Sequence, residues 1–144
     1  LKKDNIGKKI DIRARKFLKK SNLDYAHGTG HGVGFFLNVH EGPQSISKIN
    51  MVKIKEGMVL SNEPGFYKKN KFGIRIENLV YVKKRNKNLV FENLTMAPIE
   101  TDLINYNLLS NFEKNYLFKY HLDVYSKISK YLNSNEKKWL ATLI

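Results

Sequence analysis

The sequence has 144 residues, of which 42% are hydrophobic and 12% are aromatic. A chain of this length and composition can bury a core of its own, which excludes an intrinsically disordered protein. It contains no cysteine, which excludes a disulfide framework and a thiolate metal site. No apolar run approaches the roughly 20 residues that cross a bilayer, so we expect no membrane partner. No signal peptide is recognisable, but we expect the chain to begin inside a longer protein, so this absence says little about targeting. The expected location is cytoplasmic.

The formal net charge is +13, which would suit a protein that binds nucleic acid. The lysines, however, are scattered over expected loops and helix faces, commonly beside asparagine, as in residues 68–71 and 83–88. No RNA-binding or DNA-binding module is recognisable in the sequence. We therefore interpret the charge as a solvated surface and expect no nucleic-acid partner.

The first predicted element is a helix over residues 6–20. Apolar residues recur there at helical spacing, and the residues that we expect to face a sheet are Ile6, Ile10, Phe17 and Leu18. Asp11 falls inside this helix, and we interpret it as a residue of the exposed helix surface.

Residues 25–43 read YAHGTGHGVGFFLNVHEGP and include His27, His31 and His40. Glycine at every second position from 28 to 34 disfavours a helix, since each glycine costs about 1 kcal/mol there. An extended segment over 24–39 is expected instead, with bare backbone on one face and histidines on the other. At a rise of roughly 3.3 Å per residue, His27 and His31 would lie about 13 Å apart, so we expect them to have different roles.

The glycine and histidine spacings of this stretch do not match a dinucleotide-binding fingerprint, a P-loop or the zinc-binding HExxH helix. A glycine-rich strand with buried, hydrogen-bonded histidines remains the structural alternative to a functional site.

Two apolar segments, 54–62 and 72–82, predict a hairpin with a polar tip at 68–71. A hairpin centred on Asn70 places Glu63 opposite Glu77. Directly opposed carboxylates destabilise a hairpin, and cations between them would reverse that effect. Two glutamates beside a strand histidine therefore predict a metal site, and two ions suit two carboxylates better than one.

The remaining chain predicts one more strand, over 89–99, and then helices from residue 101. Ser110 and Glu113 have the spacing of a capping box, and Ser134 is expected to cap a last helix. His121 lies on the apolar side of its helix, so we expect it to pack in a core or an interface.

The motifs HGTGHGVG, LNVHEGP, SNEPGFY and GIRIEN, in this order and at this spacing, resemble those of the Xaa-Pro aminopeptidases (aminopeptidase P). These enzymes have the pita-bread metallopeptidase fold, and the similarity covers nearly the whole chain. The resemblance implies an α+β protein in which residues 1–100 form the C-terminal half of the catalytic domain. Residues 101–144 would then be a helical C-terminal extension that contributes to homodimers.

The resemblance also implies a metal site. His31, Glu63 and Glu77 match metal ligands of the family, and Arg75 matches an arginine that supports those ligands. Two divalent metal ions are implied. Oxygen-rich ligands with one imidazole suit manganese best, although cobalt or zinc could also bind.

The catalytic residues implied by the resemblance are His27, His40 and Glu63. The two histidines would line the substrate site and stabilise the reacting carbonyl, and Glu63 would take the proton of the attacking water. The expected reaction is hydrolysis of the bond between an N-terminal residue and a following proline.

The expected partners are peptides with proline at the second position, an N-terminal part of the same protein, and a second copy of the chain. The family's metal site uses two further aspartates from earlier strands, so we expect the 144-residue chain alone to be inactive. Two alternatives stay open: a non-catalytic pita-bread relative that binds RNA or protein, and another pita-bread peptidase such as methionine aminopeptidase or prolidase.

Overall fold

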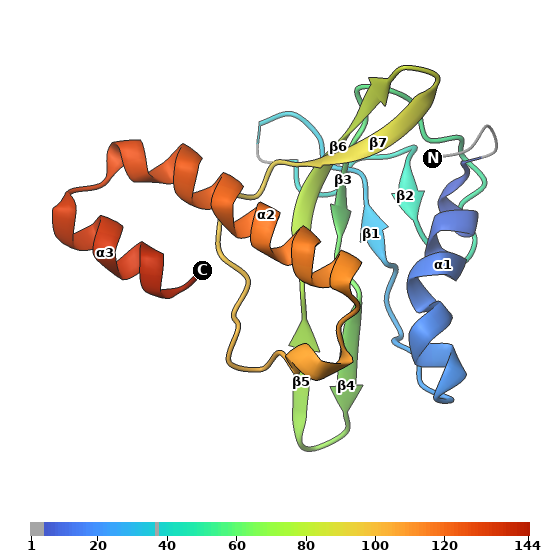
Figure 1. Ribbon diagram of the computed structural model, residues 1–144. Coiled ribbons are helices and arrows are strands. Elements are labelled where there is room, and N and C mark those ends of the chain that lie inside the picture. Colours follow the sequence, from blue (N-terminus) through green and yellow to red (C-terminus); the bar gives the residue numbers. More distant parts are fainter. Residues whose placement is uncertain (1–4, 37) are drawn as a thin grey trace. The chain divides into compact units, whose positions relative to one another are not determined.

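The computed structural model describes residues 5–36 and 38–144. The chain forms two compact units, Leu1–Thr95 and Met96–Ile144. The helix and strands of the first unit are α1 (Gly7–Lys20), β1 (Gly30–His31), β2 (Ser45–Ile46), β3 (Val59–Asn62), β4 (Gly65–Lys68), β5 (Phe72–Arg75), β6 (Asn78–Arg85) and β7 (Asn88–Asn93) (Figure 1). The second unit is helical, with α2 (Asn111–Ile128), α3 (Ser134–Thr142) and the short 3-10 turns Tyr106–Leu108 and Ser129–Tyr131. No helix among the described residues is long and apolar enough to cross a membrane.

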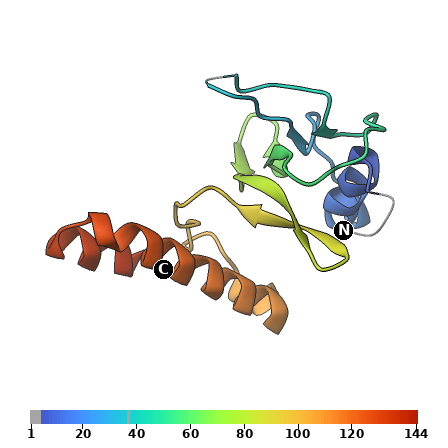
Figure 2. The same ribbon diagram turned by 90° about the horizontal axis from the view of Figure 1, so that it is seen from above.

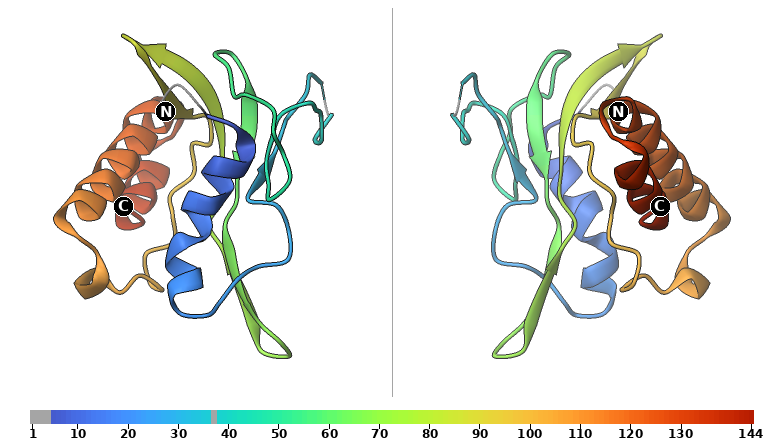
Figure 3. Two further views of the ribbon diagram at one scale, coloured as in Figure 1. Left: turned by 90° about the vertical axis from the view of Figure 1, so that its right-hand side faces the viewer. Right: turned by 90° about the vertical axis from the view of Figure 1, so that its left-hand side faces the viewer.

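Helix α1 confirms the predicted helix to within one residue. Ile10 is buried and belongs to the apolar core of the first unit, as its spacing predicts. Phe17, in contrast, is 70% exposed, so the prediction that it faces a sheet is wrong. The reason is that α1 packs beside β2, which has only two residues, so the second half of the helix extends past the strand (Figure 3).

One long hairpin dominates the first unit, and its register is the predicted one. Strands β3 and β6 pair with Asn62 opposite Asn78, and β4 and β5 pair with Gly65 opposite Arg75. Both ladders are therefore centred on Asn70, which adopts the left-handed conformation (φ 57°) that asparagine tolerates in a turn. The ladder is interrupted at residues 63–64 and 76–77, so the predicted strand 72–82 is divided into β5 and β6, which belong to two different sheets. The predicted strand 54–62 is regular only from Val59, and β4 follows it beyond the break.

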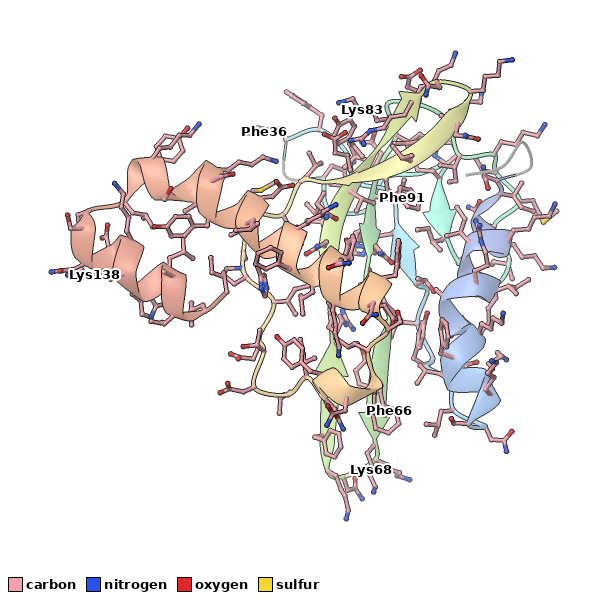
Figure 4. The ribbon with its side chains drawn as sticks, viewed as in Figure 1. Phe36, Phe66, Lys68, Lys83, Phe91 and Lys138 are labelled. Carbon is pink, nitrogen blue, oxygen red and sulfur yellow. The ribbon has the colours of Figure 1, made fainter. Side chains whose placement is uncertain are left out.

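The core of the first unit lies between α1, β2 and the inner face of the β3–β6–β7 sheet. Its buried members are Ile10, Ile46, Ile54, Leu60, Val80 and Val82. Phe91 packs against this cluster from β7, and Figure 4 shows where it lies on that strand. These side chains hold β3 in place, and β3 leads directly into the candidate site.

Two predicted strands are shorter than expected. In the stretch 24–39 only β1 is regular, because neighbouring amides bond to scattered groups: Gly32 N–H donates to Gln44 and Val33 N–H to Val59. Residue 37 of this stretch lies outside the described residues. Strand β7 ends at Asn93, six residues before the predicted end. The Leu79 carbonyl still accepts the Leu94 N–H, but the Leu79 N–H donates to the Thr95 hydroxyl and not to a backbone carbonyl.

In the second unit, α2 and α3 form a helical hairpin (Figures 1 and 2). The capping box of Ser110 and Glu113 is confirmed by bonds in both directions, at 2.8 and 3.3 Å. His121 is buried, as predicted, and its Nε2 accepts the Ile99 N–H at 3.1 Å. The cap of α3 is Asn133 and not Ser134, because the Asn133 side chain accepts the N–H groups of Asn135 and Glu136.

Candidate functional site

Glu63 occupies the break in the long hairpin, directly after β3, and it is buried. Its Oε1 accepts a hydrogen bond from Ser61 Oγ (2.8 Å) and its Oε2 accepts one from Arg75 Nη1 (2.9 Å). Its backbone N–H donates to the carbonyl of Thr29 (2.8 Å). Both oxygens and the main chain of Glu63 are therefore fixed by the protein itself.

His31, on β1, turns its ring toward this carboxylate, with Nε2 lying 3.4 Å from Glu63 Oε1. Its Nδ1 faces the carbonyl of Gly32 at 3.0 Å, and a carbonyl can only accept, so Nδ1 carries the proton. In the neutral ring, Nε2 then presents a lone pair to a carboxylate oxygen. Two acceptors at this separation need a proton or a metal cation between them.

Glycine at position 30 allows β1 to lie close to β3. A Cβ added at Gly30 would lie 1.9 Å from the carbonyl oxygen of Ser61, a separation that real Cβ atoms never reach. The Ser61 hydroxyl also accepts the His31 N–H at 2.9 Å. Position 30 therefore needs glycine because the backbone of β3 occupies the place of a side chain.

Arg75 connects the two glutamates. Its Nη1 lies 2.9 Å from Glu63 and 3.7 Å from Glu77, and both Arg75 and Glu77 are partly exposed to solvent. A hydrogen bond to Tyr67, followed by the two carboxylates, raises the pKa of Arg75 above its ordinary value. The arginine thus supplies positive charge to both carboxylates, and its role in supporting metal ligands stays a prediction from the family resemblance.

His27 lies apart from the pair formed by His31 and Glu63. Its Nε2 is 2.8 Å from the Tyr67 hydroxyl, which in turn accepts from Arg75 Nε at 2.9 Å. Its Nδ1 faces the carbonyl of Gly28 at 2.6 Å and therefore carries the proton. In the neutral ring Nε2 is consequently an acceptor, so the predicted donation to a substrate oxygen requires protonation of the ring at Nε2.

His40 is exposed, and its ring lies against that of His31 in a tilted arrangement, with 4.0 Å between the ring centroids. It comes from the loop after β1, on which Figure 4 shows Phe36 projecting outward. The six predicted site residues thus lie around one hairpin. His40 contacts His31, which faces Glu63, and Glu63 bonds to Arg75. Arg75 also contacts Glu77 and bonds to Tyr67, whose hydroxyl bonds to His27.

Two of the predicted donor atoms are spaced as ligands of one divalent ion would be. His31 Nε2 and Glu63 Oε1 are 3.4 Å apart, near the roughly 3 Å between adjacent ligands of an ion with bonds of about 2.1 Å. Within residues 5–36 and 38–144, however, no three histidine, aspartate or glutamate side chains gather closely enough to hold a metal ion. The chain therefore brings together two of the three predicted ligands, with Glu77 held nearby by Arg75.

The prediction that Asp11 belongs to the exposed helix surface is wrong. Asp11 is fully buried, because its carboxylate binds Arg15 Nε (2.8 Å) and Thr29 Oγ1 (2.6 Å). Helical spacing alone could not show that the histidine segment packs over this side of α1. The four-residue spacing of Asp11 and Arg15 was the available signal, since such pairs meet on a helix.

Sequence analysis also missed Ser61 and Tyr67, which connect the predicted residues to one another. Neither residue lies at a position that periodicity distinguishes from an ordinary strand residue. Their roles depend on contacts across strands, which the sequence does not contain.

Two family matches cover the chain. Residues 1–84 match Metallopeptidase family M24, and residues 87–143 match the C-terminal region of peptidase M24. The probable Xaa-Pro aminopeptidase P of Coprinopsis cinerea is 48% identical over 147 residues, which cover 93% of this chain and 24% of that protein. The chain therefore spans about a quarter of the length of this relative.

Solved structures match in the same way. The X-prolyl aminopeptidase of Caenorhabditis elegans, a cytosolic enzyme with a di-nuclear active site, superposes with a TM-score of 0.89 and 40% identity. The match covers 97% of this chain and 24% of that one. The prolidase of Pyrococcus furiosus matches with a TM-score of 0.54 and 34% identity, over 61% of this chain and 25% of its own.

These matches confirm the predicted α+β pita-bread fold and the resemblance on which it was based. They extend over both compact units and include all the residues of the candidate site. The chain belongs to metallopeptidase family M24.

Proposed function

We propose that the protein containing this chain is a metal-dependent aminopeptidase that removes an N-terminal residue from peptides with proline at the second position. The observation that carries the proposal is the pairing of His31 with Glu63, beside Glu77 and Arg75, in a chain that is similar over 97% of its length to an X-prolyl aminopeptidase.

In this proposal His31, Glu63 and Glu77 hold two divalent metal ions together with ligands from elsewhere in the protein. Manganese is the preferred ion, because carboxylates outnumber imidazoles in the donor set. When bound, such ions lower the pKa of the attacking water and polarise the scissile carbonyl. His31 Nε2 and Glu63 Oε1 lie 3.4 Å apart, a separation that suits two ligands of one cation.

The residues of the chain then have separate tasks. Glu63 accepts the proton of the attacking water and passes it to the proline nitrogen, which is a tertiary amide without an N–H. Its orientation is fixed by Ser61 and Arg75. His27, once protonated at Nε2, donates to the substrate carbonyl, and His40 donates beside it.

The match to the Caenorhabditis elegans enzyme over both units of the chain supports this activity. The prolidase of Pyrococcus furiosus matches 61% of the chain, whereas the Caenorhabditis elegans enzyme matches 97%, which includes the helical second unit. We also propose a homodimer and a cytoplasmic location, the latter by analogy with that cytosolic enzyme. Light scattering of the full-length protein tests the dimer.

The function is tested on the full-length protein with three peptides: one with proline at the second position, one with alanine there, and an Xaa-Pro dipeptide. We expect manganese-dependent cleavage of the first peptide and little cleavage of the alanine control. Preference for the dipeptide would indicate a prolidase. No hydrolysis with manganese, cobalt or zinc, together with binding of RNA or protein, would support the non-catalytic alternative.

A further inference from the structure

Beneath the histidine segment lies a buried polar cluster that the proposed chemistry does not use. It consists of Asp11 and Arg15 on α1 with Tyr25 and Thr29 from the segment that follows, and all four residues are at least 97% buried. The guanidinium centre of Arg15 also stacks on the Tyr25 ring, 3.8 Å from its centroid. Burying a charge is costly unless it is paired and hydrogen-bonded, so such a cluster requires a physical reason.

Arg15 contacts the main chain of the segment directly. Its Nη1 donates to the carbonyl of Tyr25 (2.7 Å) and to Asp24 (2.5 Å), and its Nη2 donates to the carbonyl of His27 (2.6 Å). Although burial opposes its charge, hydrogen bonds to Asp11 and Asp24 keep the pKa of Arg15 above its ordinary value. One planar, permanently charged group thus fixes the backbone on both sides of residue 26.

Asp11 reaches the other end of the segment. It accepts from Arg15 through Oδ2 (2.8 Å) and from the Thr29 hydroxyl through Oδ1 (2.6 Å). Since the Thr29 proton is given to Asp11, the Tyr25 hydroxyl donates to Thr29 Oγ1 (2.5 Å). The carbonyl of Thr29 in turn accepts the backbone N–H of Glu63 (2.8 Å).

We propose that Asp11 and Arg15 are positioning residues of the candidate active site, which set the placement of His27 through its carbonyl and of Glu63 through Thr29. This inference rests on the proposed function. The pair touches neither substrate nor ion. It acts through main-chain hydrogen bonds from a helix that lies outside the site.

The central variant is Arg15→Lys in the full-length protein. A lysine keeps the charge but has a single ammonium, which cannot reach the acceptors that the guanidinium fork holds. Thr29→Val is the second variant, since it breaks the link from Asp11 to Glu63 and leaves the buried charge pair intact. Arg13→Lys, on an exposed position of the same helix, is the matched control.

The first measurement is amide hydrogen exchange by mass spectrometry, which does not depend on activity. In Arg15→Lys we expect exchange to rise about tenfold or more in peptides covering residues 25–31 and Glu63, with β6 and β7 unchanged. In Thr29→Val we also expect faster exchange in the peptide that covers Glu63. Unchanged protection in both segments, or an equal rise in β6 and β7, would overturn the proposal and indicate only a stability role.

The second measurement is peptide hydrolysis per metal-loaded molecule. Arg15→Lys should lower kcat by about 10²-fold with little change in KM, as displacement of a reacting group does, while Arg13→Lys keeps normal rates. Combined with His27→Ala, the effects should be less than multiplicative, and full multiplication would contradict action through His27. If the unaltered protein does not cleave Xaa-Pro peptides, the proposed function fails, and hydrogen exchange still decides the positioning role.

Discussion

Glu63 and Glu77 occupy opposing positions in a hairpin whose register is continuous on both sides of them. Asn62 pairs with Asn78 before the break, and Gly65 pairs with Arg75 after it. Arg75 Nη1 contacts both carboxylates, at 2.9 and 3.7 Å. Opposed carboxylates repel each other unless a cation lies near them, so the break in the hairpin is a place that requires positive charge.

Replacing His31, Glu63 or Glu77 with alanine in the full-length protein should abolish turnover, because each change removes a donor that we assign to the ions. Metal content of the purified variants is the measurement, with thermal unfolding as the control for folding. Full metal stoichiometry in all three variants would contradict the ligand assignment.

Replacing His27 with alanine should have a different effect, because its Nε2 bonds to Tyr67 and not to the group formed by His31 and Glu63. We expect the metal to be retained and the rate to fall by about 10²–10³-fold, the loss typical of one donor to the reacting oxygen. His40→Ala should also retain metal and lose rate. Loss of metal from His27→Ala would disagree with the separate roles of the two histidines.

The 144-residue chain by itself should be inactive toward an Xaa-Pro peptide, even with manganese added. Its described residues bring only His31 and Glu63 together, and ligand number and geometry set metal affinity. The assay should be paired with a direct measurement of bound metal. Turnover equal to that of the full-length protein, with two ions bound per chain, would show that the chain carries a complete site.

The second unit should lose stability in mild acid because of His121. Burial lowers the pKa of this histidine, and its Nε2 accepts the Ile99 N–H, which a protonated ring could not do. The unfolded state, with a pKa of about 6.5, then binds more protons than the folded state, so stability falls as the pH drops below about 6.5.

The amide of Ile99 reports this change locally. Between about pH 7.5 and about pH 5.5, its exchange should accelerate relative to the intrinsic rate. His121→Gln, which keeps an acceptor without titrating, should remove the acceleration. An identical pH dependence in this variant would assign the effect to another group.

The hairpin register could be predicted from the sequence, because alternation of apolar residues and a polar tip at Asn70 leave few alternatives. Alternation also puts Arg75 on the same face of its strand as Glu77, whereas its supporting role was implied by the family resemblance. The break at residues 63–64 does have a signal in the sequence, because Pro64 has no N–H for the ladder and Pro-Gly is typical of a turn. The opposite strand gives no such signal, since its alternation continues through residues 76–77. At the break, the Glu63 N–H donates to the carbonyl of Thr29.

The buried cluster under the site was missed for a different reason. Periodicity describes one element at a time, whereas Asp11 is buried by residues that follow it by more than ten positions. Phe17 shows the opposite error: an apolar residue at the correct spacing is exposed because β2 is short. In both cases the burial of a helix residue is decided by which neighbouring segment covers it. The local sequence of the helix does not specify that segment or its length.

The contacts of Arg15 also mean that the histidine segment loses its conformational freedom when the chain folds, and not when a substrate binds. Fixing the backbone of one residue costs about 1–2 kcal/mol of entropy, and a flexible loop would incur that cost each time a ligand bound. Here the carbonyls of Tyr25 and His27 are already held by α1, so the cost falls on folding and not on association. A peptide substrate would bind to a histidine segment that is already ordered. Its binding energy would then remain available for orienting its scissile bond.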